Sequence, residues 1–213
     1  GDVYKRQSMG IYQRGQRDYW TFVARKPASL EFKLASGLVY GNRGSARIEV
    51  FPLAEAEGRL IGATDIPPDK EEHAVRVESV HTGLHRITVA DRGIGTRFTG
   101  PAGLPLTLVS DPTHPPHLHG RWTLYAYVPR GTPFIGGFSH GVGQLLDPAG
   151  KVAFTFTNKP GYFRVPVPEG SDGKVWCFSQ CIGDRLLMTI PPCLAEDAAE
   201  LLLPEEVVTR DAR

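Results

Sequence analysis

Short runs of alternating apolar and polar residues, separated by glycine- and proline-rich turns, constrain the fold of this chain more than any other feature. Residues 30–34 and 86–89 both alternate with a period of two, which is typical of strands with one buried face. The 24 glycines and 18 prolines are spread along the whole chain, which favours many short strands over long helices. The sequence therefore predicts an all-β protein of antiparallel β-sandwich type.

Turn sequences mark where several of these strands begin and end. The tetrapeptide DPAG at 147–150 has the residues of a type I turn, and further turns at 158–161 and 171–173 precede predicted strands at 162–167 and 174–179. Only the C-terminal end has a helical pattern. There residues 195–202 place Leu194, Ala198 and Leu201 on one face, and Pro204 is suited to open a short second helix.

The same order of sequence blocks occurs twice. Residues 20–27 (WTFVARKP) align without a gap with residues 122–129 (WTLYAYVP). Four more pairs of blocks follow in the same order: 41–44 with 147–150, 46–51 with 152–156, 75–77 with 163–165, and 93–98 with 181–186. Five blocks in one order indicate duplication. We predict two tandem jelly-roll-like repeats in which Trp20 and Trp122 occupy equivalent, buried positions.

This organisation divides the chain into five segments. Residues 2–7 (DVYKRQ) resemble the translated end of a sequencing adapter that contaminates metagenome assemblies, so the natural sequence is expected to begin near Ser8. The predicted segments are an adapter-derived stretch at 1–7, a first repeat at 8–110, a His- and Pro-rich linker at 111–120, a second repeat at 121–195 and a C-terminal helical tail at 196–213. The chain is expected to be the end of a longer protein.

Composition and charge exclude some functions. Lys plus Arg is 24 against 23 for Asp plus Glu, so the net charge is +1 and no basic excess is available for a phosphate backbone. Nucleic-acid binding is therefore not expected. The sequence contains no run of 18 apolar residues, so no membrane-spanning helix is predicted. The three cysteines, Cys177, Cys181 and Cys193, allow one disulfide with a free thiol or three buried thiols.

The strand and turn sequences carry a resemblance to known modules. The aromatic strand near Trp20 and the stretch at 80–89 (VHTGLHRITV) resemble bacterial pre-peptidase C-terminal domains. The second copy, with 127–132, 147–151 and 191–195, is similar to sandwich modules that close large secreted bacterial proteins. The resemblance implies an accessory, non-catalytic module, sometimes one that contacts polysaccharide. It transfers no catalytic residue.

One segment points to metal chemistry. Residues 114–120 (HPPHLHG) resemble the His-Pro-x-His-x-His-Gly segment of multicopper oxidases, and His117 and His119 would share a face if this segment were a strand. The Cys-containing downstream region at 178–183 lacks the histidines of that family, which argues against a multinuclear copper centre. A single copper or zinc ion held by His114, His117 and His119, with His140 as a further ligand, stays an alternative to a plain linker.

Other catalytic interpretations are weaker. Residues 137–141 (GFSHG) have the spacing of a nucleophile elbow, but no helical pattern follows them. Cys177 lies in an apolar strand and is predicted to be buried and unreactive. The carboxylates at 65, 69, 71 and 72 lie in a polar loop, where solvation is favoured over acid–base catalysis.

Two tyrosines are the candidate ligand-binding residues. Tyr125 and Tyr127 share one strand face, where they could stack on a sugar or form part of the core. We therefore expect a non-catalytic accessory or glycan-binding module of a secreted or cell-surface bacterial protein, without a cofactor. Its expected partner is a polysaccharide surface or a neighbouring domain of the same polypeptide. The alternative is a small copper- or zinc-binding oxidoreductase.

Overall fold

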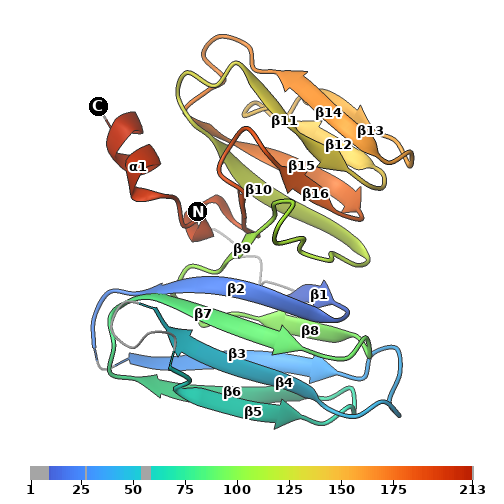
Figure 1. Ribbon diagram of the computed structural model, residues 1–213, viewed down its shortest axis with the longest axis vertical. Helices are drawn as coiled ribbons and strands as arrows, with labels where there is room; N and C mark the ends of the chain where they lie inside the picture. The colour runs from blue at the N-terminus through green and yellow to red at the C-terminus, as the bar shows by residue number, and fades with distance from the viewer. Residues whose placement is uncertain (1–9, 27, 54–58, 213) are drawn as a thin grey trace, which may run out of the picture.

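The chain folds into two β-sandwich units, stacked one above the other in Figure 1. The computed structural model describes residues 10–26, 28–53 and 59–212, so residues 2–7 lie outside it. The first unit contains eight strands: β1 (Ile11–Gln13), β2 (Gln16–Val23), β3 (Ala28–Ser36), β4 (Ala46–Pro52), β5 (Gly62–Ile66), β6 (Glu72–Ser79), β7 (Gly83–Ala90) and β8 (Thr96–Thr99).

The second unit contains seven strands, and four short elements complete the chain. The strands are β10 (Arg121–Val128), β11 (Phe134–Ser139), β12 (Gly143–Leu146), β13 (Val152–Phe156), β14 (Gly161–Pro166), β15 (Lys174–Ile182) and β16 (Arg185–Leu187). The short elements are β9 (Thr107–Val109), β17 (Cys193–Leu194), the 3-10 helix η1 (Ala198–Glu200) and the helix α1 (Glu205–Asp211). The expected all-β, antiparallel fold is confirmed.

The two units have matching strand orders. In the first, the sheets run β1-β8-β3-β6 and β2-β7-β4-β5, which is the order of a jelly roll. The second unit has the same orders with eight added to each number, namely β10-β15-β12-β13 and β16-β11-β14, except that none of its described strands takes the position of β1. At the position that β1 occupies in the first unit, the second unit has only Ser110, whose carbonyl accepts a hydrogen bond of 2.9 Å from Leu187 N of β16. The shared order fits a duplication, which itself stays a prediction.

Each sandwich encloses an aromatic and aliphatic core. In the first unit the Phe98 ring lies between Tyr19 and Phe32, with ring centroids 4.5 and 5.9 Å away. In the second unit Phe156 contacts Phe163 and Phe178 at 5.1 and 6.0 Å. All six rings face inward because buried and exposed residues alternate along their strands, as the period-two sequence pattern predicts.

A two-residue strand joins the sheets of the two units. Cys193 and Leu194 of β17 pair with β9, which in turn pairs with β2 of the first unit. Ala195, the next residue, pairs with Tyr125 of β10 through backbone N–H···O bonds of 2.7 and 3.1 Å. One isolated β-bridge therefore connects the six-stranded sheet β17-β9-β2-β7-β4-β5 to the four-stranded sheet β10-β15-β12-β13.

The segment at 111–120 is packed against the first unit. Leu118 is 4% exposed and forms a β-bridge with Gln13. The Arg17 guanidinium donates hydrogen bonds to the carbonyls of Pro116 and His117, at 2.7 and 2.8 Å. The backbone at His117 is left-handed, with φ +49°, and His117 and His119 lie outside any strand, so the strand on which their shared face was predicted is not formed.

Trp20 and Trp122 lie in different environments, which corrects the expected equivalence. Trp122 points into the second core and is 9% exposed. In β2 the inward residues are Arg17, Tyr19 and Thr21, so Trp20 is on the outer face and only partly buried. An offset of one residue between the aligned blocks exchanges the two faces of a strand. The sequence alignment of this block therefore does not superimpose equivalent side chains.

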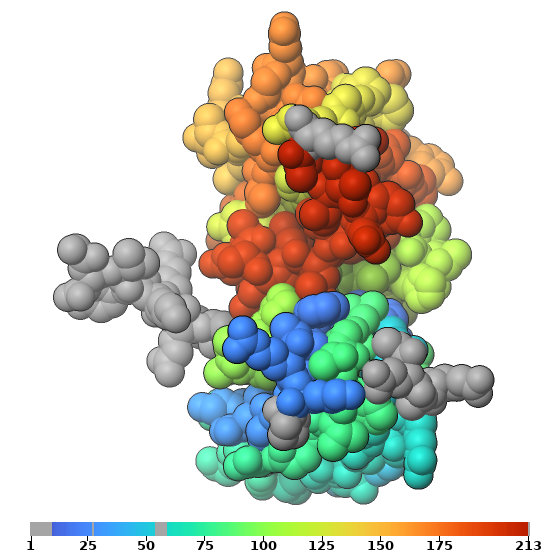
Figure 2. Space-filling view, turned by 90° about the vertical axis from the view of Figure 1, so that its left-hand side faces the viewer, coloured from blue at the N-terminus to red at the C-terminus, as the bar shows by residue number. Residues whose placement is uncertain are grey.

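The C-terminal segment corrects a second expectation. Instead of a helix at 195–202, the chain forms β17, the bridge at Ala195 and the single turn η1. The helix α1 begins after Pro204, as predicted. The segment lies over the second unit and reaches the first (red in Figure 2), where Thr107 Oγ1 donates to the carbonyl of Glu200 at 2.5 Å.

Candidate ligand-binding face

An exposed aromatic surface covers the outer side of the three-stranded sheet β14-β11-β16. Phe134, Gly136 and Phe138 alternate outward along β11, while Tyr162 and Arg164 do so along the neighbouring strand β14. Tyr162 is 81% exposed, more than any other large apolar side chain among the described residues. We call these five residues, with Leu186 and Met188 beside them, the aromatic face.

The side chains of the aromatic face form rows across the sheet. Phe138 pairs with Tyr162 on one side and with Leu186 on the other, and the Phe138 and Tyr162 rings meet edge to face at 5.4 Å. In the next row Arg164 pairs with Gly136, and its guanidinium carbon lies 4.2 Å from the centre of the Phe134 ring. These contacts fix the rings, of which Tyr162 is exposed while Phe134 and Phe138 are half-buried.

Gly136 makes room for this arrangement. A Cβ at this position would lie 3.2 Å from Thr189 Cγ2 and 3.3 Å from the Phe134 ring. The Gly136 N–H donates to Thr189 Oγ1 at 2.7 Å, and that hydroxyl donates to the Phe134 carbonyl at 3.0 Å. The absence of a side chain therefore lets Phe134 and the segment after β16 lie close to the sheet.

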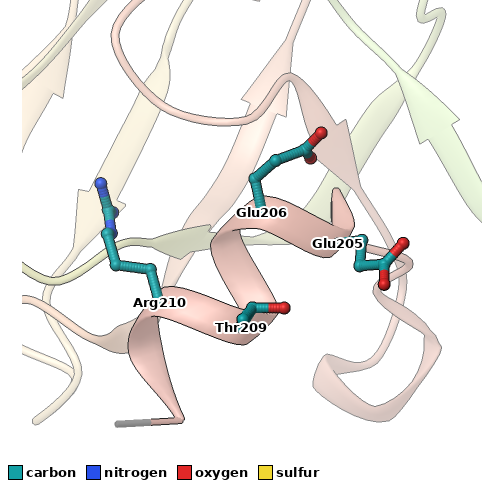
Figure 3. Close-up of a pocket in the computed structure, with 4 residues that line it drawn as sticks. All are labelled: Glu205, Glu206, Thr209 and Arg210. Atoms are coloured by element: carbon teal, nitrogen blue, oxygen red, sulfur yellow. The ribbon is translucent and has the colours of Figure 1, made fainter.

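A shallow hollow continues the aromatic face towards α1. It is lined by Phe134, Met188, Val207, Arg210 and the loop at 129–133. A second, smaller pocket on α1 is lined by Glu205, Glu206, Thr209 and Arg210, whose side chains point in different directions (Figure 3).

The structure gives Tyr125 and Tyr127 a different setting from the one expected of a sugar platform. Both are half-buried on the outer face of β10, where the C-terminal segment packs. Tyr127 donates a hydrogen bond of 2.8 Å to Asp211 of α1. Burial and this carboxylate raise the pKa of the Tyr127 phenol. These contacts give Tyr127 a role in holding α1, and ligand binding by the pair stays a prediction.

The four candidate metal ligands are not brought together. His114 is exposed and its Nδ1 lies 3.1 Å from Asp111 Oδ1, within a turn. His117, His119 and His140 are also exposed. Burial, together with the nearby Arg14 and Arg17, lowers the pKa of His119.

Across the described part of the chain, no three His, Cys, Asp or Glu side chains are grouped in a way that could hold a metal ion. The copper or zinc alternative therefore stays a prediction that this geometry does not favour.

The groups that resemble nucleophiles are enclosed. Ser139 ends β11, is 4% exposed and is followed by the strand β12 instead of a helix, so it does not form a nucleophile elbow. Ser79 and His85 form a hydrogen bond of 2.8 Å, and His85 Nδ1 lies 3.0 Å from the Gly83 carbonyl. Both side chains are at most 1% exposed, which leaves no room for a substrate.

All three cysteines are free thiols, so no disulfide joins them. Cys177 lies in β15 as expected but is only partly buried, and burial raises the pKa of its thiol. Burial raises the pKa of Cys181 and Cys193 to about 11. Thiols with such high pKa values are poor nucleophiles at neutral pH.

The carboxylates of the polar loop have structural partners or lie in solvent. Asp65 lies in β5 and pairs with Arg47 at 3.0 Å. Asp69 lies 2.9 Å from His73 Nε2, and this hydrogen bond, with one from Glu71 N, lowers the pKa of Asp69. Glu72 pairs with Lys33 at 3.1 Å.

Sequence reasoning did not single out the aromatic face. The available signal was the alternation of Phe134, Gly136 and Phe138 in β11 and of Tyr162 and Arg164 in β14, which places each set on one strand face. The same signal exists for Tyr125 and Tyr127. Which of the two faces is covered depends on the path of the C-terminal segment, which the alternation does not contain.

Comparisons with known proteins add no relative. The chain matches no protein-family model, no curated protein and no solved structure. Within the described residues, no helix is both long and apolar enough to cross a membrane.

Proposed function

We propose that this chain is a non-catalytic, glycan-binding accessory module of a larger exported bacterial protein. The observation that carries the proposal is the aromatic face, with Tyr162 81% exposed on an open sheet. Its ligand would be a polysaccharide, whose sugar rings present flat C–H surfaces to aromatic rings and hydroxyl groups to polar side chains. The supporting geometry lies in the second unit.

The chemistry of the face suits a sugar chain. The outer surfaces of Tyr162 and Phe138 offer apolar area to the C–H side of a sugar ring. Arg164, next to them on β14, carries five N–H donors and is held over the Phe134 ring, so it can donate to sugar hydroxyl or carboxylate groups. A ligand with alternating apolar and hydroxyl surfaces would use both kinds of contact.

The size of the face favours a polysaccharide over a protein partner. Strands about 4.8 Å apart and roughly 3.3 Å per residue give this three-stranded sheet an open area of about 14 Å by 20 Å. That is roughly 300 Å², whereas a stable protein–protein interface buries about 800 Å² on each partner. A chain of a few sugar residues fits the smaller area.

The experiment is affinity electrophoresis of the protein through gels containing a neutral β-glucan, a chitin-type polymer or a polyuronate. We expect at least one polymer to retard the wild-type protein and Tyr162→Ala to weaken that retardation about tenfold or more, because one aromatic ring anchors each sugar. Phe22→Ala is the matched control, since Phe22 is an exposed aromatic residue of the first unit, 45% exposed. It should bind like the wild type.

Two outcomes would contradict the proposal. The first is that none of the polymers slows the wild-type protein. The second is that Tyr162→Ala and Phe22→Ala bind equally well to a polymer that the wild type binds, which would place the site elsewhere. Circular dichroism of both variants checks that the sandwiches remain folded.

A further inference from the structure

Three neighbouring loops at one end of the first unit each carry an arginine. Arg14 lies in the turn between β1 and β2, Arg43 in the loop between β3 and β4, and Arg92 in the turn between β7 and β8. Arg43 and Arg92 are exposed and Arg14 is half-buried. This group of arginines is independent of the aromatic face, which belongs to the second unit.

Backbone hydrogen bonds hold the three loops together. Leu38 N and Val39 N donate to the carbonyls of Gly95 and Ile94, at 3.1 and 2.9 Å, which fixes the loop before Arg43 against the turn after Arg92. Arg14 Nε donates to the Gly93 carbonyl at 3.2 Å, which ties the first turn to the third. The positions of the arginines therefore follow from main-chain contacts as well as from their own side chains.

Two of the guanidinium groups share one aromatic ring. The guanidinium carbon of Arg43 lies 4.1 Å from the centre of the Tyr40 ring, and that of Arg14 lies 5.6 Å from it. Arg92 Nη1 lies 3.5 Å from the position that a Cβ of Gly44 would occupy, next to Arg43. Arg92 adopts φ +51°, a conformation that non-glycine residues rarely take.

None of these three arginines has a carboxylate ion-pair partner among the described residues, in contrast to Arg47 and Arg76. Arg47 pairs with Glu49 and Asp65, and Arg76 with Glu78, at 2.7–3.0 Å. At the three-loop site the carboxylate is Asp91, which is fully buried and accepts from the amides of Gly15 and Gly93 through Oδ1. Three positive charges thus face one internal negative charge, and the exposed side of the cluster is cationic.

We propose that Arg14, Arg43 and Arg92 form a binding site for a tetrahedral oxyanion, phosphate or sulfate. A planar guanidinium donates two parallel hydrogen bonds to such a group, and an anion at the centre would relieve the repulsion among three cations. The contact with Tyr40 leaves the N–H groups of Arg43 available, and Arg14 keeps its two Nη groups, since only its Nε donates to Gly93. The oxyanion is either a free ion or a sulfate ester on a polysaccharide.

The test is calorimetric and NMR titration of the full chain with inorganic phosphate, inorganic sulfate, sulfated dextran and uncharged dextran, each against sodium chloride of equal ionic strength. We expect inorganic phosphate and sulfate to bind with Kd of about 1–10 mM and to shift the amide signals of Gly93 and Gly95. Tighter binding of sulfated dextran by tenfold or more, with none for uncharged dextran, would identify a polymer as the source of the oxyanion. Equal affinity per sulfate would identify the free ion.

Variants separate a built site from diffuse charge. Arg43→Gln should weaken phosphate binding at least fivefold, while Arg76→Gln, which removes the same charge from a paired arginine on β6, should leave it unchanged. Arg92→Gly is the second variant, because glycine adopts φ +51° readily and the fold should be kept. It should also weaken binding at least fivefold.

The proposal is overturned by either of two results. One is a phosphate response no larger than that to chloride at equal ionic strength. The other is an equal loss in Arg43→Gln and Arg76→Gln, which would reflect the net charge of the protein and not a site. Thermal unfolding of each variant without phosphate checks that the three loops remain in place.

Discussion

Replacing Arg17 by Met tests what holds the segment between the two units. The Arg17 side chain is 4% exposed and donates to the carbonyls of Pro116, His117 and Tyr12 and to the hydroxyl of Tyr19, at distances of 2.7, 2.8, 3.3 and 3.2 Å. Met fills a similar volume but donates no hydrogen bond. The substitution therefore removes the polar contacts with little change in packing.

The magnitude follows mainly from the two short bonds. Hydrogen bonds from a charged donor contribute about 1.5–3 kcal/mol each, and part of this is offset because the unfolded chain returns the guanidinium to water. The carbonyls of Pro116 and His117 would lose their donor in a largely buried place. We expect the free energy of unfolding to fall by about 2–4 kcal/mol.

Urea unfolding followed by tryptophan fluorescence measures this change, and limited proteolysis measures whether residues 111–120 are released. Arg17→Met should lower the urea midpoint without changing the slope, and cleavage within 111–120 should become faster. Arg76→Met is the control, since Arg76 pairs with Glu78 on the surface and should change neither measurement appreciably. A loss below about 1 kcal/mol with unchanged proteolysis would show that Arg17 does not fix this segment.

Three further predictions concern single side chains. In urea unfolding, Trp122→Ala should lower the free energy of unfolding by about 3–5 kcal/mol and Trp20→Ala by only about 1–2 kcal/mol, because of the two only Trp122 points into a core. Equal losses would contradict the described faces of β2 and β10. Burial and the neighbouring Glu196 and Asp197 raise the pKa of Glu200 to about 7, so this carboxyl destabilises the fold progressively as the pH rises from 4.5 to 7. Glu200→Gln should therefore raise Tm at pH 8 but not at pH 4, and an equal effect at both pH values would refute the raised pKa. The pKa of Cys181 is raised to about 11, so only about one thousandth of this thiol should be thiolate at pH 8. A disulfide-exchange reagent should therefore label Cys181 far more slowly in the native protein than in urea. Equal labelling rates would show that Cys181 is not enclosed.

The sequence predicts the strands well where alternation runs over several residues. The segments at 30–34, 86–89, 162–167 and 174–179 all lie in strands, apart from residue 167, and the turn at 147–150 closes with a bond of 2.9 Å from Gly150 N to the Asp147 carbonyl. These elements depend on local chemistry, namely one apolar face and turn residues at fixed positions. The all-β class follows from their number and spacing.

The sequence could not predict the junction between the units. β9 and β17 contain three and two residues, which is too short for any periodicity. Their pairing is decided by which backbone groups lie opposite once both sandwiches exist. The same applies to residues 195–202, where a helical pattern of apolar residues was overridden by the pairing of Ala195 with Tyr125 and by the turn at η1.

In the candidate site, too, the local sequence pattern predicts strand faces but not which faces are covered by other segments. Tyr125 and Tyr127 in β10 have the outward alternation that Phe134 and Phe138 have in β11. The C-terminal segment packs on the first pair, whereas Tyr162 beside Phe138 is 81% exposed. The positions of outward aromatic residues were predictable, but which of them remain open to a ligand was not.

The strand β17 lies beside an edge of the first unit's sheet, and the residue after it lies beside an edge of the second unit's sheet. Before residues 193–195 are in place, β9 is the edge of the first unit's sheet and β10 is the edge of the second unit's sheet, each with unpaired backbone groups. Such edges pair readily with other chains. One short segment contacts both edges, since Cys193 and Leu194 pair with β9 and Ala195 forms a single bridge with Tyr125 of β10. The residues that join the two units therefore also cover part of two edges that could otherwise pair with other chains.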